Sequence, residues 1–164
     1  MSNGFTLIEL LVALALTVIL ATVAYPGFTA WLLDSRRDAA VTTALHAVHA
    51  ARQFAAVRAV SVDLCGTLDA THCSGAPDWS LGLLVVGEDG TVFRSLPSAP
   101  SLNGPTVVSN RAAIRFEPGT SFASPATVTV CDRRGGRSAR AVIVSRSGRP
   151  RVSERDASNR VLQC

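Results

Sequence analysis

The residues with the clearest chemical potential are arginines gathered near the C-terminus. The chain has 164 residues, and because it has no lysine its 16 basic residues are all arginine. Residues 133–164 hold nine arginines against two acids, a net charge of +7, whereas residues 1–132 have a net charge of −3. Arginine forks bind phosphate oxygens bidentately, so a clustered set is typical of a polyanion site.

The densest group lies in the stretch SRSGRPR, residues 145–151. In an extended chain Arg149 and Arg151 project to the same side, and Arg146 lies across a turn at Gly148. Pro150 would keep the segment at the edge of a sheet, accessible to a long ligand. We therefore predict a polyanion site at these arginines and Gly148, with a second patch at Arg133, Arg134 and Arg137. The alternative, favoured by charge alone, is a solvated charged face.

The sequence places no aromatic residue near these arginines. Base stacking would need one, so we expect contact with a phosphate backbone only. Such binding is weak, salt-dependent and indifferent to sequence.

Four cysteines form the second group with chemical potential. Because the apolar N-terminal run described below would export the chain, disulfides are the default for these thiols. Of three possible pairings we favour Cys65 with Cys73 and Cys131 with Cys164, because the second would tie down the last residue of the chain. Closing that loop contributes about 3 to 4 kcal/mol in the chain-entropy treatment. A zinc site is the alternative, but the chain has no C-x-x-C pair and only His72 adjoins a cysteine.

Other chemistry finds little support. His46 and His49 are three residues apart on a helix, but no acid or third histidine accompanies them, so we assign them to the helix surface or to packing. Trp79 and Phe116 are assigned to the core. No nucleophile lies beside a base, and no phosphate-binding loop, zinc-protease motif or dinucleotide fingerprint is present. We predict no enzyme activity, no cofactor and no metal site.

A 20-residue apolar run, residues 5–24, has one charge, Glu9. At about 1.5 Å per residue it spans about 30 Å, the thickness of a bilayer core. A carboxylate inside a membrane costs roughly 2.5 to 3.5 kcal/mol, so Glu9 implies a compensating partner. A secretory signal cut after Ala24 is one alternative, although residues 1–4 lack a basic side chain and the run is longer than usual. A plain membrane anchor explains the length but not Glu9.

One long helix would carry this run. Helical spacing resumes beyond Pro26 and Gly27, so we predict a helix from Phe5 to about Ala59 that is kinked at Pro26 but not ended there. Its second half should bury one face and expose another. The predicted apolar face holds Val41, Leu45, Val48, Ala51 and Ala55, and the predicted polar face holds Asp34, Arg36, Arg37, Asp38 and Arg52.

From residue 60 onward short β-type runs alternate with turn residues. Glycines in the stretches 88–90 and 134–136 supply hairpin turns because glycine accepts positive φ. Strands are predicted at residues 60–65, 80–86, 91–96, 106–109, 112–116, 126–131, 140–145 and 151–153. The Pro- and Ser-rich stretch 97–105 predicts a surface loop. The fold class is α+β: a long N-terminal helix with a membrane-embedded first half, packed on a C-terminal antiparallel β-sheet domain.

The segment GFTLIELLV, residues 4–12, resembles the class III leader and N-terminal segment of type IV pilins and pseudopilins. In that family a prepilin peptidase cuts after the glycine, the new N-terminus is methylated, and the glutamate acts in assembly. The resemblance implies cleavage between Gly4 and Phe5, methylation of Phe5 and an assembly role for Glu9. Its carboxylate can meet the amino group of Phe5 on a neighbouring subunit, which relieves two buried charges together. The four-residue leader lacks the basic residue that is usual in this family.

Later motifs extend the resemblance over nearly the whole chain. The stretch VDLC at 62–65, Cys73, DW at 78–79, Gly82, VTVCD at 128–132 and SGR at 147–149 are similar to the FimT/GspH branch of pseudopilins. The stretch GRPR, residues 148–151, resembles the GRxR element by which FimT-type minor pilins bind DNA for uptake. The resemblance therefore implies DNA as the polyanion.

Together these features predict a minor type IV pilin that joins a pilus or its tip complex and binds DNA non-specifically during natural transformation. The expected location is the bacterial inner membrane, with one span and a periplasmic domain, and later the pilus or pseudopilus. Expected partners are other pilins or pseudopilins, prepilin peptidase, the inner membrane and DNA. The predicted parts are a leader (1–4), a transmembrane and assembly helix (5–24), its amphipathic continuation (25–59) and a β-domain (60–164).

Two alternatives keep part of this description. A GspH-like minor pseudopilin of type II secretion would have the same anchor and no role in DNA binding. An exported soluble binding protein would follow if the run 5–24 were an ordinary signal.

Overall fold

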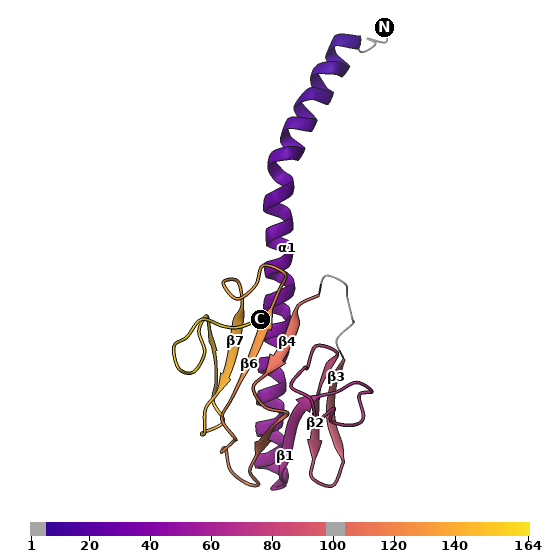
Figure 1. The fold of residues 1–164 in the computed structure, drawn as a ribbon. Coiled ribbons are helices and arrows are strands. Elements are labelled where there is room, and N and C mark those ends of the chain that lie inside the picture. The colour runs from indigo at the N-terminus through magenta and orange to yellow at the C-terminus, as the bar shows by residue number, and fades with distance from the viewer. Residues whose placement is uncertain (1–5, 98–103) are drawn as a thin grey trace. The chain divides into compact units, whose positions relative to one another are not determined.

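A computed structural model describes residues 6–97 and 104–164 (Figure 1). It begins with the helix α1, Leu7–Arg58, which is 52 residues long and continues through Pro26. This confirms the prediction of one long helix, although the predicted first residue, Phe5, lies outside the described part of the chain. The chain consists of two compact units, one ending at Ser35 and one running from Arg36 to Cys164.

The first unit contains the apolar half of α1. Its large side chains, among them Leu7, Leu10 and Ile19, are exposed. An 18-residue window of α1 has a mean hydropathy of 2.6 with none of its residues buried. By length and composition α1 is thus the one helix of the described residues that could cross a membrane.

The second unit contains eight strands in two four-stranded antiparallel sheets. The first sheet has the order β3-β2-β1-β5 and the second the order β4-β6-β7-β8. The strands are β1 (Val62–Gly66), β2 (Gly82–Gly87), β3 (Val92–Pro97), β4 (Thr106–Ser109), β5 (Ala113–Phe116), β6 (Ala126–Cys131), β7 (Arg140–Val144) and β8 (Pro150–Ser153). Every predicted strand is present, with its ends within two residues of the predicted ones. The division into two sheets was not predicted.

Both sheets pack on the same stretch of α1, which lies behind them in Figure 1. The helix contributes mainly small residues, including Ala44, Ala47, Ala51 and Ala55, which let the strands approach closely. Opposite them lie alternate residues of the strands, such as Val62 and Leu64 of β1 and Val128, Val130, Val142 and Val144 of the second sheet. Trp79 and Phe116 are fully buried, as predicted. Alternation with period two therefore sets which strand residues face the helix.

One residue of the predicted polar face is buried. The Arg37 side chain is only 7% exposed, and it donates to the carbonyl oxygen of Ser138 at 2.8 Å and to Asp38 Oδ1 at 2.8 Å. Ser138 lies in the connection between β6 and β7, so the arginine fastens α1 to that connection. The prediction was wrong here because helical spacing does not reveal that a backbone carbonyl 101 residues away accepts from this side chain.

The outer face of the second sheet is covered by the C-terminal tail. Ala141 and Ile143 of β7 form a small apolar cluster with Cys131 and with Leu162 of the tail. A disulfide between Cys131 and Cys164 holds the last residue of the chain on this face. This cross-link is one of the two pairs that the sequence favoured, and it counteracts fraying of the terminus.

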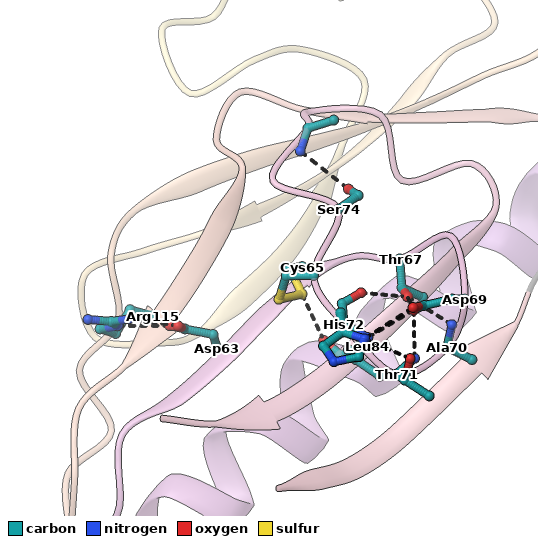
Figure 2. The surroundings of a disulfide bond; sticks show 12 residues. Asp63, Cys65, Thr67, Asp69, Ala70, Thr71, His72, Ser74, Leu84 and Arg115 are labelled. Carbon is teal, nitrogen blue, oxygen red and sulfur yellow. Dashed lines mark hydrogen bonds and ion pairs between the residues drawn. A yellow bond between two sulfur atoms is a disulfide. The ribbon is translucent and has the colours of Figure 1, made fainter. Parts of the chain in front are cut away.

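The second favoured pair, Cys65 and Cys73, closes the loop after β1 (Figure 2). Inside this loop the Asp69 carboxylate accepts the backbone N–H groups of Thr71 and His72, each at 2.9 Å. These bonds, that of Thr71 first, hold the pKa of Asp69 well below its usual range. The loop is fixed by its disulfide and by this carboxylate.

Candidate nucleic-acid interface

The predicted polyanion site lies at the hairpin between β7 and β8. We call residues 145–151 the arginine hairpin. The backbone N–H of Gly148 donates to the carbonyl oxygen of Ser145 at 2.9 Å, and that of Ser145 donates to the carbonyl oxygen of Arg149 at 3.2 Å. The Ser145 hydroxyl adds bonds to Arg149 and Ser147. Because β8 is the edge strand of its sheet, one side of the hairpin faces no further strand.

Gly148 sits at the tightest point of this turn. Its φ is +67°, a left-handed conformation that favours glycine. A Cβ at this position would collide with the carbonyl oxygen of Ser121 and would lie 3.6 Å from Cδ of Arg52 on α1. The sequence predicted Gly148 as part of the site, and the structure gives it the role of a close approach between backbones.

The three arginines of the predicted site are available for a ligand. Arg146, Arg149 and Arg151 are exposed, and their guanidinium groups make no hydrogen bond or ion pair with any described residue. The hairpin itself contains no acid. Its positive charge is therefore not neutralised locally.

The predicted second patch does not join this site. Arg133, Arg134 and Arg137 lie in the connection between β6 and β7, residues 132–139, at the other end of β7. Five residues of strand separate the two ends by about 16 Å. Arg134 also pairs with Asp132 at 2.6 Å, and this hydrogen bond lowers the pKa of Asp132, whose side chain is 4% exposed. The second patch is thus separate and partly neutralised.

Further arginines near the C-terminus are used within the fold. Arg140 pairs with Glu154 at 3.0 Å, and Arg160 pairs with Asp156 at 2.8 Å. The Arg155 guanidinium donates to the carbonyl oxygen of Asn159. The net charge of +7 thus overstates what a ligand can meet.

Two neighbours of the arginine hairpin were missed from the sequence. Arg52 was placed on the polar face of the helix and not in the site, although the turn at Gly148 packs beside it. Phe122 is 53% exposed, and the next residue, Ala123, donates its backbone N–H to the carbonyl oxygen of Arg146 at 2.9 Å. The sequence offered one indication of Phe122, because it is a single aromatic residue in a loop and fits no helical or strand periodicity. The expectation that no aromatic lies near the arginines did not foresee Phe122, whose loop meets the hairpin through backbone contacts between segments distant in sequence.

The other residues singled out from the sequence do not belong to the arginine hairpin. Glu9 forms a reciprocal capping box with Thr6 at the start of α1, each accepting a bond from the other at 3.2 to 3.3 Å. Gly4 and Phe5, the predicted cleavage junction, lie outside the described residues. His46 and His49 are exposed. Within residues 6–97 and 104–164, no three His, Cys, Asp or Glu side chains are grouped so as to hold a metal ion.

Two family models match the sequence. The prokaryotic N-terminal methylation motif matches residues 1–25, which include the junction and Glu9. The model described as type II transport protein GspH matches residues 40–148, more than half of the chain. The chain belongs to the GspH family. With the methylation motif, this membership makes the chain a type IV minor pilin or pseudopilin. Its apolar N-terminal helix fits an anchor in the inner membrane.

The fold agrees with this membership of the GspH family. A crystal structure of the type IV minor pilin FimU from Pseudomonas aeruginosa PAO1 superposes with a TM-score of 0.52 and 16% identity, covering 75% of this chain and 87% of that one. A second crystal form of FimU gives a TM-score of 0.46 with 16% identity over 75% and 91% of the two chains. The first match shows a shared pilin-like fold. No curated protein sequence matches the chain significantly.

Proposed function

We propose that this protein is a minor pilin that binds DNA non-specifically through the arginine hairpin and so supports DNA uptake in natural transformation. The observation that carries the proposal is the group of three exposed guanidinium groups, Arg146, Arg149 and Arg151, without a carboxylate partner on a fixed turn at a sheet edge. Such groups bind phosphates and release counterions from DNA. The proposal includes no catalytic role.

Assembly into a filament places the hairpin where DNA can reach it. We propose cleavage between Gly4 and Phe5, methylation of Phe5 and an assembly role for Glu9, with the domain in the periplasm. The carboxylate of Glu9 would then exchange its bond with Thr6 for the amino group of a neighbouring subunit.

Mass spectrometry of the mature N-terminus tests the processing step. N-methylated Phe5 is the expected first residue. Tyr25 as the first residue would contradict the proposal and support an exported soluble protein. Glu9→Gln tests assembly. Because a glutamine also completes a capping box, this substitution removes only the negative charge. Glu9→Gln should therefore be made and inserted normally and fail to enter filaments.

Retention of duplex DNA by the full chain in detergent micelles tests the binding step. Arg149→Gln with Arg151→Gln should lose retention that wild type shows at low salt. The matched control, Arg36→Gln with Arg94→Gln, removes the same charge from exposed residues away from the hairpin and should retain DNA nearly as well. Equal retention by both double variants would contradict a hairpin site.

A pseudopilin of type II secretion without a DNA role is the second candidate, because the matching family model carries the description of a type II transport protein. The two functions separate in cells. Arg149→Gln with Arg151→Gln should reduce transformation and leave protein secretion unchanged if the DNA proposal is right. Loss of secretion with intact DNA retention would favour the second candidate.

A further inference from the structure

The most unusual side chain near the arginine hairpin is Phe122. Phe122 is 53% exposed, whereas Phe116, six residues earlier, is fully buried. A single exposed aromatic residue is ordinary on a protein surface. Its position beside free arginines is what makes Phe122 informative.

The backbone around Phe122 is fixed. We call residues 117–122 the aromatic loop. The N–H of Phe122 donates to Oγ1 of Thr120 at 3.2 Å, and its carbonyl oxygen accepts the N–H of Glu117 at 3.0 Å. Gly119 donates to the carbonyl oxygen of Ala55 at 3.0 Å, which ties the loop to α1. The ring is therefore presented from a preorganised loop, so that little ordering is needed when a ligand binds.

Two contacts, one just before and one just after Phe122, hold this part of the chain against the arginine hairpin. Before it, the carbonyl oxygen of Ser121 lies so close to Gly148 that a Cβ there would collide with it. After it, Ala123 donates its N–H to the carbonyl oxygen of Arg146 at 2.9 Å. Phe122 thus borders a turn that carries guanidinium groups before and after Gly148, with Arg52 of α1 beneath that glycine.

A phosphate-binding group beside an exposed aromatic face is the chemistry that binds single-stranded nucleic acid. We infer that Phe122 and the arginine hairpin form a site for single-stranded DNA, in which a base stacks on Phe122 while the arginines hold the phosphates on either side. A phenyl ring makes no hydrogen bond to a base, so the site reads no sequence. This inference rests on the proposed function and adds to it the class of DNA that the site prefers.

Duplex DNA cannot use the same ring. Its base faces are stacked on one another, so only the arginines engage it. The aromatic contribution should therefore appear with a single strand and vanish with a duplex or with a strand that lacks bases. Charge alone would instead make the duplex the more tightly bound probe, because a duplex has the higher charge density.

Fluorescence anisotropy of the full chain in detergent micelles tests the inference with three probes: oligothymidylate, an abasic oligomer of the same length, and a duplex with the same number of phosphates. Phe122→Leu keeps an apolar side chain and removes the π face. It should weaken oligothymidylate binding at least about fivefold, while affinity for the other two probes changes by less than about twofold. Phe122→Tyr should bind as wild type does. Leu68→Ala, at an exposed apolar residue of the Cys65–Cys73 loop, is the control and should change nothing.

A second readout does not depend on affinity. In Phe122→Trp, oligothymidylate should quench the added tryptophan fluorescence and the abasic oligomer should not, because quenching requires a stacked base. The native tryptophans Trp31 and Trp79 are present in both proteins, so the difference in fluorescence from wild type reports position 122.

The outcomes separate the inference from the proposed function. If Arg149→Gln with Arg151→Gln weakens every probe while Phe122→Leu weakens none, or weakens all equally, the inference is wrong and the proposed function stands. The second pattern would assign Phe122 to packing of the hairpin. If the arginine variant changes none of the probes, the proposed function is wrong.

Discussion

The two connections of β7 carry similar numbers of arginines but differ in how far these arginines are bound within the fold. In the connection before it, residues 132–139, Arg134 is bound to Asp132, while Arg133 and Arg137 are exposed. Arg37 of α1 also donates to Ser138 there, and the neighbouring Cys131 is cross-linked to Cys164. In the arginine hairpin after it, the guanidinium groups have no partner among the described residues. Clustered arginines in a sequence can therefore stabilise the fold or remain available to bind a ligand. Which of the two they do depends on whether carboxylates and carbonyls lie near enough to accept their hydrogen bonds.

The glycines of the two connections offer the largest expected difference. Gly148 and Gly135 both have positive φ, and a side chain at Gly135 would meet nothing within 4 Å. Gly135→Ala should cost about 1 kcal/mol of the free energy of unfolding, from backbone strain alone. Gly148→Ala adds the collision with Ser121 and should cost about 3 kcal/mol. Thermal unfolding followed by circular dichroism measures both, and equal costs would contradict the packed turn.

Arg37 tests whether the connection before β7 depends on its arginine for stability. Arg37→Ala leaves the Ser138 carbonyl without its donor and should lower the free energy of unfolding by about 2 kcal/mol. Arg36→Ala, at the exposed neighbour, should change it by less than about 0.5 kcal/mol. The same unfolding measurement applies. A small effect at Arg37 would mean that water replaces the arginine as donor to Ser138.

Acid should loosen the connection before β7 and spare the arginine hairpin. The bond from Arg134 lowers the pKa of Asp132, so the folded protein binds this proton less readily than the unfolded chain. The stabilisation is complete above the ordinary aspartate pKa of about 3.9 and is lost as pH falls through the lowered folded value. Hydrogen exchange should show residues 132–139 opening below about pH 4, while the acid-free hairpin stays protected. Simultaneous opening of both would contradict this account.

The smallest expected effect comes from an acid in the aromatic loop, which lies beside the arginine hairpin. Glu117 lies in the aromatic loop and is exposed. In water, two unit charges about 10 Å apart interact by about 0.4 kcal/mol, and an effect of this size would let Glu117→Gln raise affinity for duplex DNA about twofold. Glu88→Gln, in the turn between β2 and β3, is the matched control. Fluorescence anisotropy at low salt measures both, and a gain at Glu88 as large as at Glu117 would show only a general charge effect.

Local patterns predicted most of the fold. The spacing of Val41, Val48, Ala51 and Ala55 indicated the buried face of α1, and these residues are buried. Alternation and turn glycines indicated all eight strands. The pairing of these strands into two sheets could not be predicted, because it depends on contacts between segments distant in sequence.

The candidate site was predicted in part, for the same reason. Arg146, Arg149 and Arg151 are close in sequence and remain close in the fold. The pairing of Arg140 with Glu154 and the burial of Arg37 against Ser138 depend on neighbours from other elements. Phe122 reaches the hairpin only through its own loop, 24 residues before Arg146, so no local pattern reveals it.

We propose that the arginine hairpin, and not the connection before β7, is the main contact for DNA. The salt dependence of duplex binding by the full chain tests this most directly, since each phosphate contact contributes a slope of about 0.9 in log affinity against log salt. Arg149→Gln with Arg151→Gln should reduce the slope by about 1.8, and Arg133→Gln with Arg137→Gln should reduce it by clearly less. An unchanged slope for the hairpin variant, or an equal reduction for both, would contradict the account.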